Sequence, residues 1–411
     1  MQISDSIIQD NLKNSTHLNY SLRNWNTESW KKLPILQQPK FQKDDVYFKI
    51  LSEIAKVKSF IEFESLERIK KKLSSASSGN CFVLQTGDCA EQFKDCTQEK
   101  VEKKLSEYEA QKDFLQKILC KEVLLIGRIG GQFAKPRSEE FEKINGVLFP
   151  VYRGDIVNLP DKSLEARQHN SRNLKIAQLC AENVHKFIKD YNKKDEIFTA
   201  HEALLLDYEN CYTKYHKKKN KYYNSSTHFF WIGERTRQYN NAHIEYASKL
   251  FNPIGIKISE NLNCEELINI IKKINPLNEE GKITLISRFG VNKVERYLPN
   301  LIQIVKKNLL NVTWVCDPMH GNTQQTTNKT KTRSLENIQK EVLMNIEIHG
   351  NENSVLAGVH LETTDQIVTE CFSENSNITI FDVEKNYKTA CDPRLNPDQT
   401  REVLKLFNRL N

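Results

Sequence analysis

The chain has 411 residues, a formal net charge of +7 and a hydrophobic content of 38%. Its length suits one large domain or two modest ones, and the small positive charge suits anionic small molecules at least as well as nucleic acid. No apolar run approaches the roughly 18 residues that a membrane helix needs, and the polar N-terminus resembles neither a signal peptide nor a transit peptide. These features exclude a membrane protein and predict a cytoplasmic one that binds no nucleic acid.

Ten cysteines are scattered along the chain without a CxxC pair. Since no secretion signal accompanies them, we expect reduced cytosolic thiols. The absence of paired cysteines also argues against a structural zinc site.

The N-terminal region divides into three parts. Residues 1–24 are polar and rich in Asn and Ser, which predicts a loosely ordered segment. Residues 25–39 hold two tryptophans and two prolines, which indicates an extended segment packed across a domain. Apolar residues recur at helical spacing over 44–73 and predict a helix there. We therefore expect residues 25–411 to form a single catalytic domain with N-terminal and C-terminal additions.

Eight apolar, β-prone runs follow, and each one closes on polar or charged residues. The runs are 82–86, 123–126, 196–199, 228–232, 254–256, 283–286, 311–316 and 355–359. Amphipathic helical patterns fill most of the gaps, over 101–118, 163–191, 264–274, 293–309 and 335–347. Strand and helix alternating eight times predict an α/β fold, the (β/α)8 TIM barrel of about 250 residues. A doubly wound sheet is the alternative, but no GxGxxG-type turn follows the first run.

Two groups of side chains gather just past these runs, where α/β proteins bind their ligands. The first, which we name the donor cluster, consists of Cys89, His320, Glu362 and Asp392. One thiol, one imidazole and two carboxylates suit a borderline divalent ion such as Mn²⁺, Co²⁺, Fe²⁺ or Zn²⁺. His360 lies two positions before Glu362, so both face one side of a strand and periodicity cannot choose between them. Glu362 is preferred because it lies nearer the strand's C-terminal end.

The second group, which we name the cationic cluster, consists of Arg128, Lys135, Arg137, Arg235, Lys257 and Arg288. One such residue alone is usually half of a salt bridge, but several converging on a barrel mouth repel one another unless anions neutralise them. Guanidinium groups bind phosphate and carboxylate in a bidentate manner, so we expect small phosphorylated acids as ligands. Glu234, beside Arg235, is placed to orient the guanidiniums or a water molecule.

Five motifs carry a resemblance to a known family. They are Gly87-Asp88-Cys89-Ala90-Glu91, Gly127-Arg128 with Lys135-Pro136-Arg137-Ser138, Gly233-Glu234-Arg235-Thr236-Arg237, Asp317-Pro318-Met319-His320-Gly321-Asn322-Thr323 and Thr389-Ala390-Cys391-Asp392-Pro393-Arg394-Leu395-Asn396. With these motifs in this order, from about residue 30 to the C-terminus, the chain resembles the class II (plant-type) DAHP synthases. Those enzymes make deoxy-arabino-heptulosonate phosphate (DAHP), the first intermediate of aromatic biosynthesis, on a (β/α)8 barrel.

The resemblance implies a role for each cluster. The donor cluster matches the family's metal ligands, with Mn²⁺ the first choice of ion, and this match also favours Glu362 over His360. The residues that match the phosphoenolpyruvate site are Arg128, Glu234, Lys257 and Arg288, with Lys135 and Arg235 close by. Arg137 and Ser138 fall where the phosphate of erythrose 4-phosphate is held. The departures from the family's usual residues, none of them at a ligand position, are Gln92, Phe289 and Thr364-Asp365.

The implied reaction is a metal-dependent, aldol-like condensation of phosphoenolpyruvate with erythrose 4-phosphate and water, which yields DAHP and phosphate. Arg128, Glu234 and Lys257 would be its catalytic residues, in a homo-oligomeric enzyme. Two alternatives stay open at this point. The same reaction could supply a secondary pathway such as phenazine formation, or the barrel could be a non-catalytic binding partner, since fold alone never fixes function.

Overall fold

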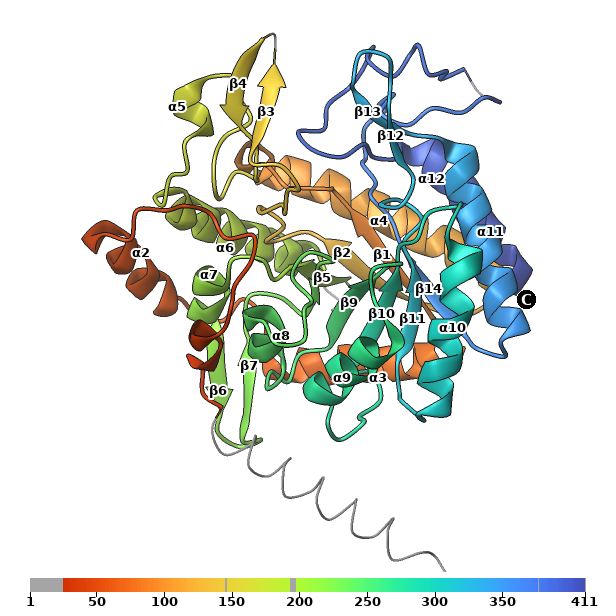
Figure 1. Ribbon diagram of the computed structural model, residues 1–411, viewed down its shortest axis with the longest axis horizontal. Coiled ribbons are helices and arrows are strands. Elements are labelled where there is room, and N and C mark those ends of the chain that lie inside the picture. The colour runs from red at the N-terminus through yellow and green to blue at the C-terminus, as the bar shows by residue number, and fades with distance from the viewer. Residues whose placement is uncertain (1–24, 145, 193–196, 376, 411) are drawn as a thin grey trace, which may run out of the picture.

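The computed structural model describes residues 25–144, 146–192, 197–375 and 377–410. Eight parallel strands close into a barrel at its centre (Figure 1), in the order β1-β14-β11-β10-β9-β8-β5-β2. The barrel strands are β1 (Cys81–Gly87), β2 (Glu122–Arg128), β5 (Ile197–Glu202), β8 (Phe229–Ile232), β9 (Ile254–Ile258), β10 (Ile283–Ser287), β11 (Thr313–Cys316) and β14 (Leu356–His360). The (β/α)8 barrel and all eight predicted strand positions are confirmed. The prediction for residues 1–24 lies outside the described residues, as does residue 196 at the start of the third run.

The barrel strands are apolar on both faces because side chains fill the interior and helices cover the outside. Every residue of the eight strands is buried except Glu122, which begins β2. The helix α3 (Phe63–Ser77) adds Ile69 and Leu73 to the apolar cluster formed by residues from seven of these strands, Val83 and Phe198 among them. This helix contacts β1, β11 and β14, so it covers one region of the barrel and leaves the carboxyl ends of the strands for a site.

Helices surround the barrel and bury their apolar faces against it. They are α4 (Gln98–Leu119), α6 (Asn173–Tyr191), α7 (Leu206–Cys211), α8 (Ala242–Ala247), α9 (Cys264–Ile274), α10 (Val294–Lys307), α11 (Leu335–Asn351) and α12 (Pro397–Lys405), with short 3₁₀ helices η1 (Ser29–Lys32), η2 (Phe93–Asp95) and η3 (Leu406–Leu410). The helices predicted over 101–118, 264–274, 293–309 and 335–347 are confirmed. None of the helices in the described ranges is both long and apolar enough to cross a bilayer.

The N-terminal segment lies across α8, as its composition predicts. Trp30 is buried in the same apolar cluster as Ala242 and Tyr246 of that helix. The amide of Ala242 donates to the carbonyl oxygen of Pro34 at 2.9 Å, and this bond fixes the extended part of the segment. This segment is therefore part of the barrel's packed surface.

The single helix predicted over 44–73 is wrong: the chain forms α2 (Asp45–Ala55) and, after a break, α3. In the break, the amides of Phe60 and Ile61 donate to the carbonyl oxygen of Ser225 at 3.0 and 3.3 Å. Ile61 also packs with Phe63 and Tyr223 in a separate apolar cluster. These contacts with a distant part of the chain override the local helical pattern.

The single helix predicted over 163–191 is also wrong, because a short α5 (Leu164–Arg167) precedes α6. The side-chain amide of Asn158 donates to the carbonyl oxygen of Arg167 at 3.0 Å. The amide of Asn170 then donates to the carbonyl oxygen of Val157, also at 3.0 Å. Both bonds draw the chain back towards the loop after β2 and end the first helix.

Within the described ranges, three two-stranded antiparallel sheets lie outside the barrel, and they were not predicted. They are β3 (Phe141–Ile144) with β4 (Val147–Pro150), β6 (Thr213–His216) with β7 (Lys221–Asn224), and β12 (Thr323–Gln325) with β13 (Lys331–Arg333). The first and third rise at the top of Figure 1, and β6–β7 lies at the bottom. Strand β13 carries Lys331 to the site described next.

Candidate active site

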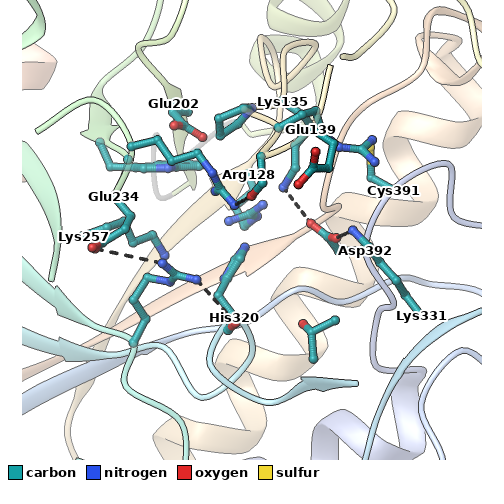
Figure 2. Close-up of a pocket in the computed structure, with 18 residues that line it drawn as sticks. Arg128, Lys135, Glu139, Glu202, Glu234, Lys257, His320, Lys331, Cys391 and Asp392 are labelled. Atoms are coloured by element: carbon teal, nitrogen blue, oxygen red, sulfur yellow. Dashed lines mark hydrogen bonds and ion pairs between the residues drawn. The ribbon is translucent and has the colours of Figure 1, made fainter. Parts of the chain in front are cut away.

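A cavity of about 330 Å³ opens at the carboxyl ends of the barrel strands. Figure 2 shows the side chains around it, with Arg128 near the centre, Cys391, Asp392 and Lys331 on one side, and Glu234 and Lys257 on the other. All six members of the cationic cluster line this cavity, and so do Ser138, Glu234 and the donor-cluster residues His320 and Asp392. The structure thus brings together residues from the loops or ends of at least six elements, as the barrel fold predicts.

The donor cluster is assembled in one place. Ligand atoms of Cys89, Glu362 and Asp392 all lie within 4.8 Å of one another. The fourth member joins them because His320 Nε2 lies 3.1 Å from Glu362 Oε1. Its other ring nitrogen, Nδ1, lies 2.8 Å from Asp317 Oδ2, the carboxylate–histidine arrangement that orients metal-binding imidazoles.

The charges of the two carboxylates are compensated by neighbouring cations. Burial alone would raise the pKa of Glu362, but His320, Lys135 and Arg333 hold it well below its usual value. Burial likewise opposes ionisation of Asp392, while Lys135 and Lys331 hold its pKa well below the usual range. Both groups are therefore carboxylates at neutral pH.

Cys89 differs, because burial, a hydrogen bond with Cys391 and the charge of Glu362 all raise the pKa of its thiol. Its sulfur lies 3.4 Å from Asp392 Oδ2. A divalent cation would convert this thiol to the thiolate that binds metals, since such ligands lose their protons on binding. One sulfur, one nitrogen and two carboxylate oxygens within reach of a single point fit a borderline divalent ion.

His360, the alternative to Glu362, has both ring nitrogens engaged. Nδ1 lies 2.7 Å from the side-chain oxygen of Gln85, and Nε2 contacts the guanidinium of Arg128. Burial and the charges of Lys257 and Arg128 hold the pKa of this imidazole well below its usual value, so it is neutral. Glu362 is the better-placed donor of the two, although the described atoms of Asp317, His320 and His360 also lie within 4.8 Å of one another.

At its outer end the cationic cluster has few carboxylate partners in the part of the chain that the structure describes. Arg235 donates to the hydroxyl of Ser138 at 2.5 Å. Arg288 donates to the carbonyl oxygen of His320 at 3.4 Å, and its closest ion-pair distance is 4.0 Å, to Glu234. Burial and the neighbouring charge of Arg288 lower the pKa of Arg235. Two guanidiniums that repel each other in a half-buried cavity favour an anion between them.

Lys257 and Arg128 occupy the deeper part of the cavity. Burial lowers the pKa of Lys257 to about 8, even though its ammonium group contacts Asp317. Arg128 is fully buried, donates to the carbonyl oxygen of Asp88 at 2.9 Å and lies 4.9 Å from the ring centroid of Trp231. It also donates to Glu362 at 3.0 Å, so it links the two clusters.

Glu234 is held as a hydrogen-bond acceptor. It accepts from Arg237 at 2.7 Å and from the hydroxyl of Ser259 at 2.6 Å. At the rim, Arg137 donates to the carbonyl oxygen of Tyr152 at 2.6 Å. These bonds fix the direction of both side chains before any ligand arrives.

The loops after β10 and β11 approach each other so closely that glycine is required. A Cβ atom on Gly321 would lie 2.2 Å from the amide nitrogen of Gly290, which has φ +82°. Glu341 of α11 accepts from the Gly290 amide at 2.8 Å and from the Asn322 side chain at 2.6 Å. This packing places Arg288 and His320, one from each loop, on the same side of the cavity.

Three residues of the site had no role assigned from the sequence. Asp317 and Glu202 were visible as polar residues at the ends of apolar runs, which was the signal that could have found them. Lys331 gave no such signal, because it lies on a short hairpin outside the barrel. Its ammonium group lies 2.7 Å from Asp392 Oδ1.

The fold and the site are those of a (β/α)8-barrel enzyme, because potential metal ligands and converging guanidiniums lie together at the carboxyl ends of the strands. The chain belongs to the class-II DAHP synthetase family, whose sequence model matches residues 25–192 and 176–407. It is 35% identical to the phospho-2-dehydro-3-deoxyheptonate aldolase of Neurospora crassa, over 92% of this chain and 92% of that one. It is 31% identical to the enzyme of that name from Streptomyces coelicolor, over 91% of this chain and 95% of the relative. The resemblance inferred from the five motifs is confirmed, and the protein is a transferase.

Proposed function

We propose that the protein is a DAHP synthase that condenses phosphoenolpyruvate with erythrose 4-phosphate and water, giving DAHP and phosphate, at the entry to aromatic biosynthesis. The observation that carries this proposal is that His320 and Asp392 of the donor cluster line one cavity of about 330 Å³ together with all six residues of the cationic cluster. Two phosphorylated substrates, one of them also a carboxylate, supply the anions that the cationic cluster favours. We place this reaction in the cytoplasm.

Phosphoenolpyruvate fits between the outer and the deeper parts of the cationic cluster. Arg235 and Arg288 repel each other across a space that a phosphate or carboxylate group would neutralise. Lys257 and Arg128 lie deeper, so together the four groups bind both anionic ends of the molecule and fix its enol carbon. Such fixed orientation converts an encounter of two molecules into a reaction within one complex.

Erythrose 4-phosphate fits the rim side. Arg137 and the hydroxyl of Ser138 lie beside Lys135 in the loop after β2, and all three line the cavity. With its phosphate held there, the aldehyde end of the sugar extends towards His320 and Asp392. A divalent ion held by Cys89, His320, Glu362 and Asp392, Mn²⁺ as the first choice, supplies Lewis-acid polarisation of a carbonyl group when bound.

The side chains themselves handle the water and the charge. As the enol carbon attacks the aldehyde, positive charge develops on the carbon that bears the phosphate. Glu234, already held by Arg237 and Ser259, orients a water molecule that adds to this carbon. The guanidiniums stabilise the phosphate group as it leaves.

The direct test measures phosphate release and phosphoenolpyruvate loss in parallel. The enzyme is assayed with and without erythrose 4-phosphate, and with and without added Mn²⁺ after chelation. We expect one phosphate to be released for each phosphoenolpyruvate consumed. Both changes should occur only when both substrates and the metal are present. Phosphate release from phosphoenolpyruvate alone would indicate a phosphatase, and no release with Mn²⁺, Co²⁺, Fe²⁺ or Zn²⁺ would contradict the proposed function.

A further inference from the structure

Glu202 ends strand β5 and lines the cavity, yet neither cluster includes it. The residue is 7% exposed. Its backbone amide donates to the side-chain oxygen of Gln132 at 2.8 Å, which fixes the end of the strand. Its Oε1 atom is buried and accepts no hydrogen bond from the described part of the chain. A buried carboxyl oxygen without a partner is costly, so its retention needs an explanation.

The other acidic residues that line the cavity are accounted for. Asp392 lies 3.3 Å from the ammonium group of Lys135 and 2.7 Å from that of Lys331. Glu234 accepts hydrogen bonds from Arg237 and Ser259, as described above, and Glu139 lies at the exposed rim. Among the described lining residues, Glu202 alone combines burial with an unsatisfied carboxyl oxygen.

The fold makes room for the Glu202 carboxyl group at this point. A Cβ atom on Gly233 would lie only 2.1 Å from Glu202 Oε1. Gly233 therefore lets the carboxyl group lie directly against the backbone of the loop that carries Glu234 and Arg235. Figure 2 shows Glu202 and Glu234 on the same side of Arg128. Glu202 thus lines the same cavity as Glu234 and Arg235.

The burial of Glu202 favours the protonated form of its carboxyl group. Burial raises the pKa of this carboxyl, and the rise persists although four basic side chains oppose it. These basic side chains come from several elements around the cavity: Lys135 after β2, Lys257 on β9, Arg235 after β8 and His320 after β11. A carboxyl group whose protonated form is favoured beside reacting substrates can donate a hydrogen bond and a proton.

We propose that Glu202 is a further catalytic residue, which donates a proton to the aldehyde oxygen of erythrose 4-phosphate as the new carbon–carbon bond forms. This inference rests on the proposed function. The π electrons of the enol form the C–C bond, the π pair of the aldehyde moves to its oxygen, and that oxygen takes the proton from the Glu202 carboxyl. The water that adds to the phosphate-bearing carbon gives a proton back to the Glu202 carboxylate. The remaining hydroxyl proton leaves with the phosphate, so atoms and charges balance over one turnover.

The test compares Glu202→Gln and Glu202→Asp with the wild type and with Glu122→Gln, which removes a carboxyl at the opposite end of the barrel. Removing a general acid typically costs about 10²–10⁴-fold in rate, so we expect that loss in kcat for Glu202→Gln and a smaller one for Glu202→Asp. Binding of phosphoenolpyruvate, followed by tryptophan fluorescence because Trp231 lines the cavity, should stay close to the wild-type value. Glu122→Gln should keep its wild-type kcat.

The pH profile of kcat separates an acid from a structural residue. A general acid must be protonated, so wild-type kcat should fall as pH rises through the pKa of Glu202 in the substrate complex. The residual rate of Glu202→Gln should lack this fall. Two results would overturn the role of Glu202 and leave the proposed function intact. One is a wild-type kcat in Glu202→Gln, and the other is the same fall of kcat with rising pH in both proteins. A wild-type enzyme that consumes no phosphoenolpyruvate with erythrose 4-phosphate would overturn both.

Discussion

The donor cluster and the outer part of the cationic cluster, Arg235 and Arg288, are neighbours at the barrel mouth. Their charges are balanced in opposite ways. Glu362 lies between the guanidiniums of Arg128 and Arg333, at 3.0 and 2.8 Å, and Asp392 lies between two lysines. Arg235 and Arg288 have a hydroxyl, a carbonyl oxygen and one carboxylate at 4.0 Å. The chain therefore neutralises its buried carboxylates itself but leaves two guanidiniums for a ligand.

This difference indicates what each region does. Buried carboxylates need cations to stay ionised, and the surrounding arginines and lysines keep the donor cluster ready for a metal ion before one binds. Guanidiniums with so few close carboxylates among the described residues keep their affinity for an incoming phosphate or carboxylate. Changes in the donor cluster should therefore affect metal binding, whereas changes in the cationic cluster should affect substrate affinity.

The largest effect is expected for Cys89→Ser in the donor cluster. A neutral hydroxyl replaces the thiolate poorly, so metal affinity should fall by more than the roughly 10–100-fold that follows loss of a second-sphere partner. Activity should fall with it and return only partly in excess Mn²⁺. Metal content after dialysis and rates across a Mn²⁺ titration measure both. Cys264→Ser, on helix α9, is the matched control and should behave as wild type; a full metal content in Cys89→Ser would remove the sulfur from the ligand set.

Arg288→Ala should come next and act on substrate affinity. Losing a charge-assisted pair costs about 2–5 kcal/mol, and the low end applies because this side chain is 19% exposed. At tenfold per 1.4 kcal/mol, about 2 kcal/mol is roughly a 30-fold loss in kcat/KM for phosphoenolpyruvate. Metal content should not change. Arg401→Ala, on the exposed face of α12, serves as the control, and an unchanged KM for phosphoenolpyruvate in Arg288→Ala would place that anion elsewhere.

A smaller, pH-dependent effect is expected from Lys257, whose pKa is about 8 in the free enzyme because of burial. Its ammonium group loses its charge as pH rises through 8, so kcat/KM for phosphoenolpyruvate should fall above that pH. Lys257→Arg keeps the charge and should not show this fall if the variant binds substrate. A fall at the same pH in Lys257→Arg would assign it to another group.

The lowered pKa of Lys257 also changes the folding stability, and it does so in the opposite direction to the substrate affinity. Between pH 8 and the ordinary lysine pKa of 10.5, the unfolded chain holds a proton on Lys257 that the folded protein has released. Stability from this group therefore rises with pH in that window, while substrate affinity falls. Chemical denaturation at pH 8 and pH 10, for wild type and Lys257→Arg, measures the difference.

The smallest effect under reducing conditions is expected for Cys391→Ser. A hydrogen bond with Cys89 lowers the pKa of the Cys391 thiol, so in metal-free protein hydrogen peroxide should oxidise Cys391 to the sulfenic acid. The Cys89 sulfur then displaces water from it and forms a disulfide that dithiothreitol reverses. Cys391→Ser should keep its activity in reducing buffer and lose this reversible inactivation. Peptide mapping that finds two free thiols in inactive, oxidised wild type would contradict this prediction.

The sequence predicted the barrel because its signal is local. Strands buried on both faces read as continuous apolar runs, and the polar residues after them mark the ligand-binding end. The helix breaks before Phe63 and before Asn173 could not be predicted, because hydrogen bonds to Ser225 and Val157 cause them. Those partners approach only when the barrel closes.

The candidate site, too, could be predicted from the sequence only in part. Residue types pointed to the donor cluster, but the 3.4 Å approach of Cys89 and Asp392, from opposite ends of the chain, needed the closed fold. Glu202 was visible only as a polar strand end, since its unsatisfied oxygen depends on the backbone at Gly233. Lys331 reaches Asp392 from a hairpin for which no strand pattern was recognised.

Anomalous diffraction from crystals of the protein soaked in Mn²⁺ tests the central claim most directly. The contrast between the two regions predicts one strong manganese peak, within bonding distance of Cys89, His320, Glu362 and Asp392. It also predicts no manganese among the guanidiniums of the cationic cluster. A peak at Asp317 and His360 instead, or no peak at the donor cluster at saturating Mn²⁺, would contradict the account.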